Sequence, residues 1–175
     1  MQLQDKQRIA ILSAYALALH GFESLVPMPL PWVRVGLANI ITVTTFILLG
    51  FRAAMMVTLV RVFIASLLTG SFLGPGFILS AGGGLAGILA MGLVRRLLPL
   101  LFGPVGLSLT GALFHNLAQL FLAYLLFVQK IEPVLLITPA LMLIGTVTGL
   151  VNGLVADILV KGLKNSEAAI QNTSS

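Results

Sequence analysis

Several side chains that could bind a ligand lie inside strongly apolar stretches of the chain. Arg61 is near the middle of one such stretch, and His115, Asn116 and Gln119 lie within another. Polar groups are costly in hydrocarbon, so those kept there are typical of binding sites or of contacts between helices. A guanidinium in mid-membrane needs an anion or several hydrogen-bond acceptors around it. These four residues are therefore the first candidates for a binding site.

Further polar residues flank the neighbouring apolar stretches. Glu23 follows the first stretch, and Arg34 and Asn39 begin the second. Counted along helices at about 1.5 Å per residue, all of these groups fall in the middle or outer half of the membrane. We therefore predict a substrate site that opens to the outer side and contains Glu23, Trp32, Arg34, Asn39, Arg61, His115, Asn116 and Gln119.

Trp32 belongs to an apolar, proline-rich loop, Val26 to Val33, whose backbone is restricted by its prolines. The loop is either a lid whose tryptophan closes on the ligand or an interfacial segment with Trp32 in the aromatic belt. His115 and Gln119 are four residues apart, so they share one face of a helix.

Each candidate also has a structural interpretation. Asn116 and Gln119 could join neighbouring helices, Arg34 could be an interfacial anchor, and Glu23 could neutralise Arg61. An anionic group of the ligand is the alternative partner for Arg61. Asn152 and Asp157 are expected closer to the opposite, cytoplasmic side, with Asp157 an interfacial residue rather than a proton relay.

The sequence contains no recognisable catalytic motif. No two acidic residues lie within five positions of each other, so the sequence lacks the carboxylate cluster that would hold magnesium against a diphosphate. The chain has 0 cysteines and no Walker motif, and its run Gly82-Gly83-Gly84 lacks the lysine of a phosphate loop. We therefore expect no enzyme, no metal site and no cofactor.

Composition fixes the class of protein that must position these residues. Of 175 residues, 58% are hydrophobic and 9% are charged, and the mean hydropathy is +1.09. A soluble domain carries about 25% charged residues, so a soluble enzyme is excluded. The net charge of +5 would suggest nucleic acid in a soluble protein, but here the basic residues stand at the ends of apolar segments. We expect the lipid bilayer as surroundings and no nucleic acid as partner.

Apolar segments and breaking residues predict an all-α, polytopic bundle of six membrane spans. Pro27, Gly50, Gly74 and Gly103-Pro104 mark the breaks. The spans are expected over about Ile9–Phe22, Val35–Leu49, Ala53–Leu68, Phe77–Val94, Val105–Val128 and from Val134 or Thr138 to Val160. Residues 1–164 would form one domain and residues 165–175 a polar flexible tail.

The basic residues orient the bundle. An inside amino terminus collects seven of them on the cytoplasmic side and leaves only Arg34 and Lys130 outside, as the positive-inside rule requires. Both termini are therefore expected to be cytoplasmic, in a multi-pass protein of a bacterial cytoplasmic membrane. The seven residues are Lys6, Arg8, Arg52, Arg95, Arg96, Lys161 and Lys164.

Small residues recur at helical spacing in two of the spans, and such stripes let helices approach closely. A glycine stripe in the last span is expected to pack inside the bundle. An alanine stripe in the first span could pack internally or dock another membrane protein. The stripes are Gly145, Gly149 and Gly153, and Ala10, Ala14 and Ala18.

Two segments resemble the signatures of a known family. Residues 33–40 read Val-Arg-Val-Gly-Leu-Ala-Asn-Ile, and residues 111–120 read Gly-Ala-Leu-Phe-His-Asn-Leu-Ala-Gln-Leu. Both resemble signatures of the Gx transporter family, which is also described as heptaprenyl diphosphate synthase component I. The resemblance extends from about Arg8 to Lys161. That family is similar to the substrate-binding S components of energy-coupling factor (ECF) transporters.

The resemblance implies a six-helix subunit that captures a small vitamin-like or amphipathic molecule from outside. It also implies docking onto an ECF transmembrane coupling subunit driven by two ATPase subunits, with Ala10, Ala14 and Ala18 matching the docking stripe of S components. Two alternatives stay open, a noncatalytic membrane subunit of a polyprenyl diphosphate synthase and a stand-alone ion-coupled carrier.

Overall fold

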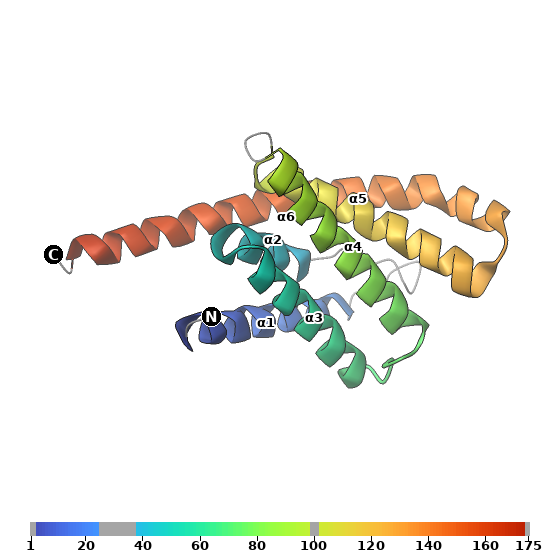
Figure 1. Cartoon of the computed structure of the whole chain (residues 1–175), viewed down its shortest axis with the longest axis horizontal. Coiled ribbons are helices and arrows are strands. Elements are labelled where there is room, and N and C mark those ends of the chain that lie inside the picture. Colours follow the sequence, from blue (N-terminus) through green and yellow to red (C-terminus); the bar gives the residue numbers. More distant parts are fainter. Residues whose placement is uncertain (1–2, 25–37, 99–101, 174–175) are drawn as a thin grey trace.

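The computed structural model describes residues 3–24, 38–98 and 102–173, with side chains for residues 6–22, 38–98 and 102–165. All regular structure within these ranges is helical, which confirms the predicted all-α class. Figure 1 shows the arrangement of the helices, which are α1 (Leu3–Ser24), α2 (Ala38–Leu49), α3 (Phe51–Leu68), α4 (Pro75–Leu97), α5 (Pro104–Ala123) with a π-helical turn η1 (Tyr124–Val128), and α6 (Ile131–Thr173).

Four of these helices are long and apolar enough to cross a membrane. They are α3, α4, α5 with η1, and residues 131–165 of α6, whereas α2 is a shorter apolar helix. The start of α1 and the end of α6 lie toward the same side of the bundle (Figure 1). The chain is thus a helical membrane protein, while the count of six spans, the cytoplasmic termini and the division into bundle and tail stay predictions. The backbone is helical as far as Thr173.

The predicted breaks coincide with helix boundaries. Gly50 has φ of 85° and separates α2 from α3, a conformation that a residue with a Cβ rarely adopts. Gly74 and Gly103 precede α4 and α5, whose first residues are Pro75 and Pro104. Proline is favoured at this position because the first helical N–H has no partner within the helix. The prolines of the first loop lie outside the described residues.

Helix α2 lies at the centre of the bundle, in contact with α1, α3, α5 and α6. All of its residues from Ile40 to Phe46 are buried. A helix that is covered on every side is apolar all round, and the threonines of α2 fit this rule because a threonine hydroxyl can bond within its own helix. Thr45 Oγ1, for example, donates to the carbonyl oxygen of Ile41 at 2.6 Å.

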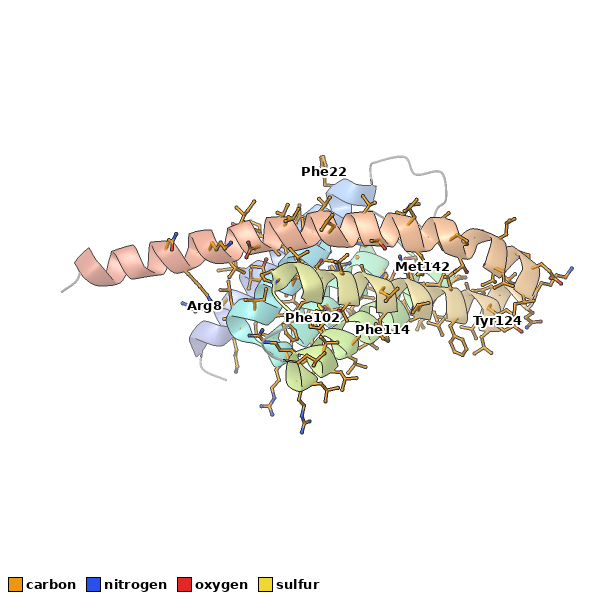
Figure 2. All side chains as sticks on the ribbon, turned by 90° about the horizontal axis from the view of Figure 1, so that it is seen from above. Arg8, Phe22, Phe102, Phe114, Tyr124 and Met142 are labelled. Atoms are coloured by element: carbon orange, nitrogen blue, oxygen red, sulfur yellow. The ribbon has the colours of Figure 1, made fainter. Side chains whose placement is uncertain are left out.

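Large apolar side chains cover the outside of the bundle. Phe22 is 63% exposed and Leu136 is 81% exposed, and Figure 2 shows Phe22 pointing away from the bundle. In water such a surface would associate or precipitate, whereas in a bilayer it meets lipid chains. The exposed side chains therefore agree with the membrane assignment.

Glycines set the distance between α5 and α6, which run antiparallel. A Cβ at Gly149 would lie 3.0 Å from Ala112 Cβ, and one at Gly153 would lie 3.0 Å from Ser108 Cβ. Gly145 faces Asn116 in the same register. The predicted internal packing of this glycine stripe is confirmed, and it brings α6 close to the polar residues of α5.

Candidate functional site

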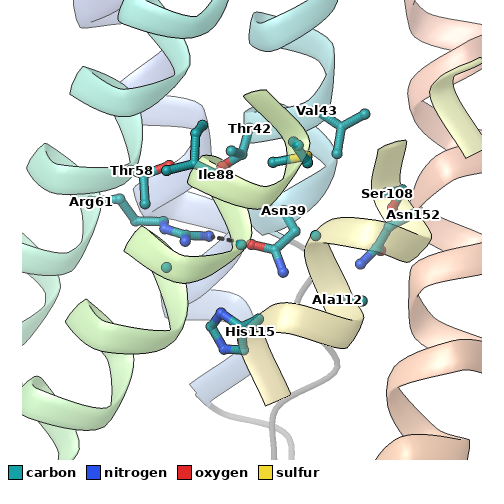
Figure 3. A pocket seen from close by; sticks show the side chains of 14 residues that line it. Asn39, Thr42, Val43, Thr58, Arg61, Ile88, Ser108, Ala112, His115 and Asn152 are labelled. Atoms are coloured by element: carbon teal, nitrogen blue, oxygen red, sulfur yellow. Dashed lines mark hydrogen bonds between the residues drawn. The ribbon is translucent and has the colours of Figure 1, made fainter. Parts of the chain in front are cut away.

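A small cavity lies where α2, α3, α4, α5 and α6 meet (Figure 3). Its volume is about 20 Å³, enough for a water molecule or a chemical group of similar size. Apolar side chains of Val43, Ile88 and Met91 form part of its wall. The polar lining residues come from four of the five helices and are Asn39, Thr42, Thr58, Arg61, Ser108, His115 and Asn152.

Arg61 is the charged residue of this cavity, and only 6% of its surface is exposed. Its Nη1 donates a hydrogen bond to Asn39 Oδ1 at 3.2 Å, which joins α3 to the start of α2. Thr58 lies one turn earlier on the same face of α3, and its buried hydroxyl has no hydrogen-bond partner. The sequence therefore placed Asn39 and Arg61 correctly in one polar cluster.

His115 reaches the cavity from α5 because the part of α4 that faces it consists of glycines. A Cβ at Gly83 would lie 2.9 Å from the imidazole, and one at Gly87 would lie 2.8 Å from the carbonyl oxygen of Gly111. The glycine-rich part of α4 is thus the surface on which the histidine ring packs. Gln119 Cγ also lies 2.9 Å from the Cβ position of Gly83, which confirms that His115 and Gln119 share one face of α5.

The other two polar residues of α5 hydrogen-bond to neighbouring helices. Asn116 Nδ2 donates to the carbonyl oxygen of Leu141 on α6 at 3.0 Å, and Gln119 Nε2 donates to that of Leu79 on α4 at 3.5 Å. Neither is among the described residues that line the cavity. Their geometry matches the interpretation as contacts between helices, and a role in ligand binding stays a prediction.

Asn152 was expected deeper toward the cytoplasm than the other polar residues and was not assigned to the site, but it lines the cavity. The residue is 2% exposed and lines the cavity together with Ser108. The sequence feature that could have placed Asn152 is the glycine stripe. Gly153 lets α6 pack closely against Val105 and Ser108 of α5. Asn152 is the next residue in the chain and lies in the same interface.

Other predicted positions have different environments. Trp32 and Arg34 lie outside the described residues, as does the side chain of Glu23. Asp157 pairs with Lys161 at 2.6 Å on α6, and its interfacial position stays a prediction. The three residues of the alanine stripe on α1, Ala10, Ala14 and Ala18, are exposed.

Polar and apolar side chains alternate around the cavity. In Figure 3, Ile88 lies close to Thr58 and Arg61, whereas Asn152 and Ser108 lie on another side of the cavity. Among the described residues, no group of three or more His, Cys, Asp or Glu side chains could hold a metal ion. The arrangement is suited to holding a polar group beside an apolar one.

The chain matches a known protein family. The model of the family described as heptaprenyl diphosphate synthase component I matches residues 12–159. The chain belongs to this family. The match confirms the resemblance identified from the two sequence signatures. No curated protein and no solved structure matches the chain.

Proposed function

We propose that the chain is the substrate-binding membrane subunit of an ECF-type importer. The observation that carries this proposal is the convergence of polar side chains from several helices on one cavity within an apolar bundle, around Arg61. Buried ionisable groups in membrane bundles are typical of substrate pathways. The subunit would capture a small amphipathic or vitamin-like molecule from the outer side of a bacterial cytoplasmic membrane.

The surface of α1 supports the same role. Ala10, Ala14 and Ala18 are exposed, whereas Ala16 on the inner face is 0% exposed. A stripe of alanines that the bundle leaves uncovered allows a helix of another membrane protein to approach closely. A transmembrane coupling subunit would dock here, and two ATPase subunits would supply the energy.

Co-expression with an ECF coupling module tests the proposal. We expect the full chain to copurify with the module and to support ATP-dependent uptake in proteoliposomes. Ala14→Leu should weaken copurification because the added side chain separates the two helices, while Ala140→Leu on the exposed face of α6 should leave it unchanged. Uptake by the chain alone, abolished by dissipating an ion gradient, would overturn the proposal in favour of a stand-alone carrier.

The description of the family favours a second candidate, a noncatalytic membrane subunit associated with a polyprenyl diphosphate synthase. In this role the chain would anchor the catalytic partner at the bilayer, where the apolar product accumulates. Stoichiometric copurification with such a synthase, together with no association with a coupling module, would favour this candidate over the importer.

A further inference from the structure

The start of α3 and the end of α4 form one corner of the bundle, and this corner carries arginines. Arg52 is the second residue of α3, and Arg95 and Arg96 stand in the last turn of α4. The side chains of all three are exposed. We propose that this corner, through Arg52 and Arg96, binds the phosphate headgroup of an anionic phospholipid. This site goes beyond the two functions considered above and depends on neither.

A contact between an aromatic ring and a glycine brings the two helix ends together. A Cβ added at Gly92 of α4 would lie 2.8 Å from the ring of Phe51, so the ring occupies the space that a side chain at this position would fill. Arg52 follows Phe51 directly, and Arg96 lies one turn after Gly92 on the same face of α4. The contact therefore places two arginines at neighbouring helix ends.

The lengths of the two helices put this corner at a membrane surface. Both α3 and α4 are long and apolar enough to cross a bilayer, and a short turn joins the end of α3 to the start of α4. The two helices pack against each other in opposite directions, so the start of α3 and the end of α4 lie toward the same surface (Figure 1). Phospholipid headgroups occupy this level of the bilayer.

The side chains at the corner match the parts of a phospholipid. A guanidinium presents a planar fork of N–H donors to phosphate oxygens, and basic residues beside membrane helices attract anionic lipids. Phe51 is 38% exposed, and aromatic rings are common at the level of the headgroups. One turn closer to the middle of each helix, Met56 on α3 and Leu93 on α4 are exposed and would meet acyl chains.

The opposite ends of α3 and α4 provide a comparison within the same helix pair. The segment that joins them, residues 66–78, contains no charged residue. The arginines of the corner therefore mark one end of the pair, and an anionic headgroup would associate with that end alone.

Thermal unfolding of the purified full chain in a neutral detergent tests the proposal. Dioleoyl phosphatidylglycerol and dioleoyl phosphatidylcholine, which have the same acyl chains, are titrated separately, and inorganic phosphate is a third probe at constant ionic strength. We expect phosphatidylglycerol to raise the unfolding midpoint in a saturable way and more than phosphatidylcholine, and inorganic phosphate to leave it unchanged. Arg52→Gln and Arg96→Gln should each weaken the apparent affinity for phosphatidylglycerol by about fivefold, the effect of one basic residue at an anionic membrane surface.

Two control variants remove one exposed positive charge elsewhere. Lys130 directly precedes α6, and Lys164 lies in the last third of α6; both are exposed. We expect Lys130→Gln and Lys164→Gln to bind phosphatidylglycerol like the wild type. An equal loss of affinity in all four variants would overturn the proposal, because it would show attraction by net charge rather than binding at this corner.

The lipid comparison on the wild type decides even where a variant fails to fold. Equal effects of the two lipids would overturn the proposal and favour an acidic protein surface as the partner of this corner. Stabilisation by inorganic phosphate that is lost in Arg52→Gln or Arg96→Gln would overturn it in favour of free phosphate as the ligand.

Discussion

Arg61 and Asn39 are far apart in the sequence and meet through a side-chain hydrogen bond of 3.2 Å. The bond holds the guanidinium against the start of α2, inside a bundle whose interior is poor in water. A charge in such surroundings is costly unless it is compensated. In the proposed importer, Arg61 would line the substrate site.

Two substitutions at Asn39 test how much its hydrogen bond with Arg61 contributes to stability. Asn39→Ala removes the acceptor and should lower the midpoint of thermal unfolding in detergent, by about 1–3 kcal/mol in unfolding free energy. Asn39→Asp is the control, because it keeps an oxygen within reach of Arg61 Nη1, and its midpoint should stay equal or rise. Equal midpoints for Asn39→Ala and the wild type would contradict this contribution of the hydrogen bond.

Thr58 provides a second test at the scale of one residue. Thr58→Val removes a hydroxyl that has no hydrogen-bond partner and keeps the shape of the side chain. We expect stability in detergent to be unchanged or slightly higher, because a buried hydroxyl without a partner is unfavourable. Thermal unfolding of the purified full chain measures this stability. A clearly lower midpoint in Thr58→Val would show that the hydroxyl contributes to folding.

At the scale of helices, α4 forms the surface against which α5 presents His115. Gly83 and Gly87 face the histidine ring and the backbone of Gly111 at distances that exclude a methyl group. The glycines therefore determine how closely α4 approaches α5, and so the position of the imidazole at the cavity. In a bilayer, where helices gain little from burying apolar surface against each other, such close packing is a main source of stability.

A methyl group on this face should separate the helices. In Gly87→Ala the new Cβ would lie 2.8 Å from a backbone oxygen, which cannot rotate away. We expect a loss of about 1–3 kcal/mol in unfolding free energy, the usual cost of overpacking. Gly76→Ala on the same helix meets no atom within 4 Å and should be neutral or stabilising. Equal denaturant midpoints for the two variants would show that α4 does not pack as described.

Helix α5 also distributes its polar residues among its neighbours. His115 faces the cavity and α4, Gln119 bonds to α4, and Asn116 bonds to α6. Two neighbouring residues on a helix point about 100° apart, so His115 and Asn116 cannot serve the same site equally well. The helix thus combines one cavity residue with two that join it to its neighbours.

At the scale of the whole molecule, the start of α1 and the end of α6 lie toward one side, and α6 is far longer than a bilayer is thick (Figure 1). Its 43 residues would extend about 65 Å, against a hydrocarbon core of about 30 Å. If α6 crosses the bilayer as predicted, its two ends lie on opposite sides, so this helix is suitable for testing the orientation.

The absence of cysteine from the sequence allows single-cysteine labelling without a background. We expect Lys164→Cys to react with a membrane-impermeant maleimide only after the cells are permeabilised, and Glu132→Cys to react in intact cells. This follows from the bias of basic residues toward the cytoplasm. The reverse pattern would place the termini outside, and labelling of both variants from one side would contradict a membrane span in α6.

The sequence by itself determined the class of the protein, several breaks between helices and two polar residues of the cavity, whereas α1 begins earlier and α6 ends later than predicted. Apolar composition requires lipid, and glycine and proline limit helices through backbone properties that do not depend on neighbours, as at Gly50 and Pro104. Arg61 and Asn39 could be found because a polar group in an apolar segment is exceptional wherever it lies. These are local or compositional properties, and they are visible without coordinates.

Only the tertiary structure decided which polar residues share one cavity. Asn152 joins the site and Asn116 turns toward α6, although both are polar residues in apolar helices. The difference depends on the rotation and register of each helix against its neighbours. These are set by contacts between distant residues, such as Gly153 with Ser108, which depth along one helix does not specify.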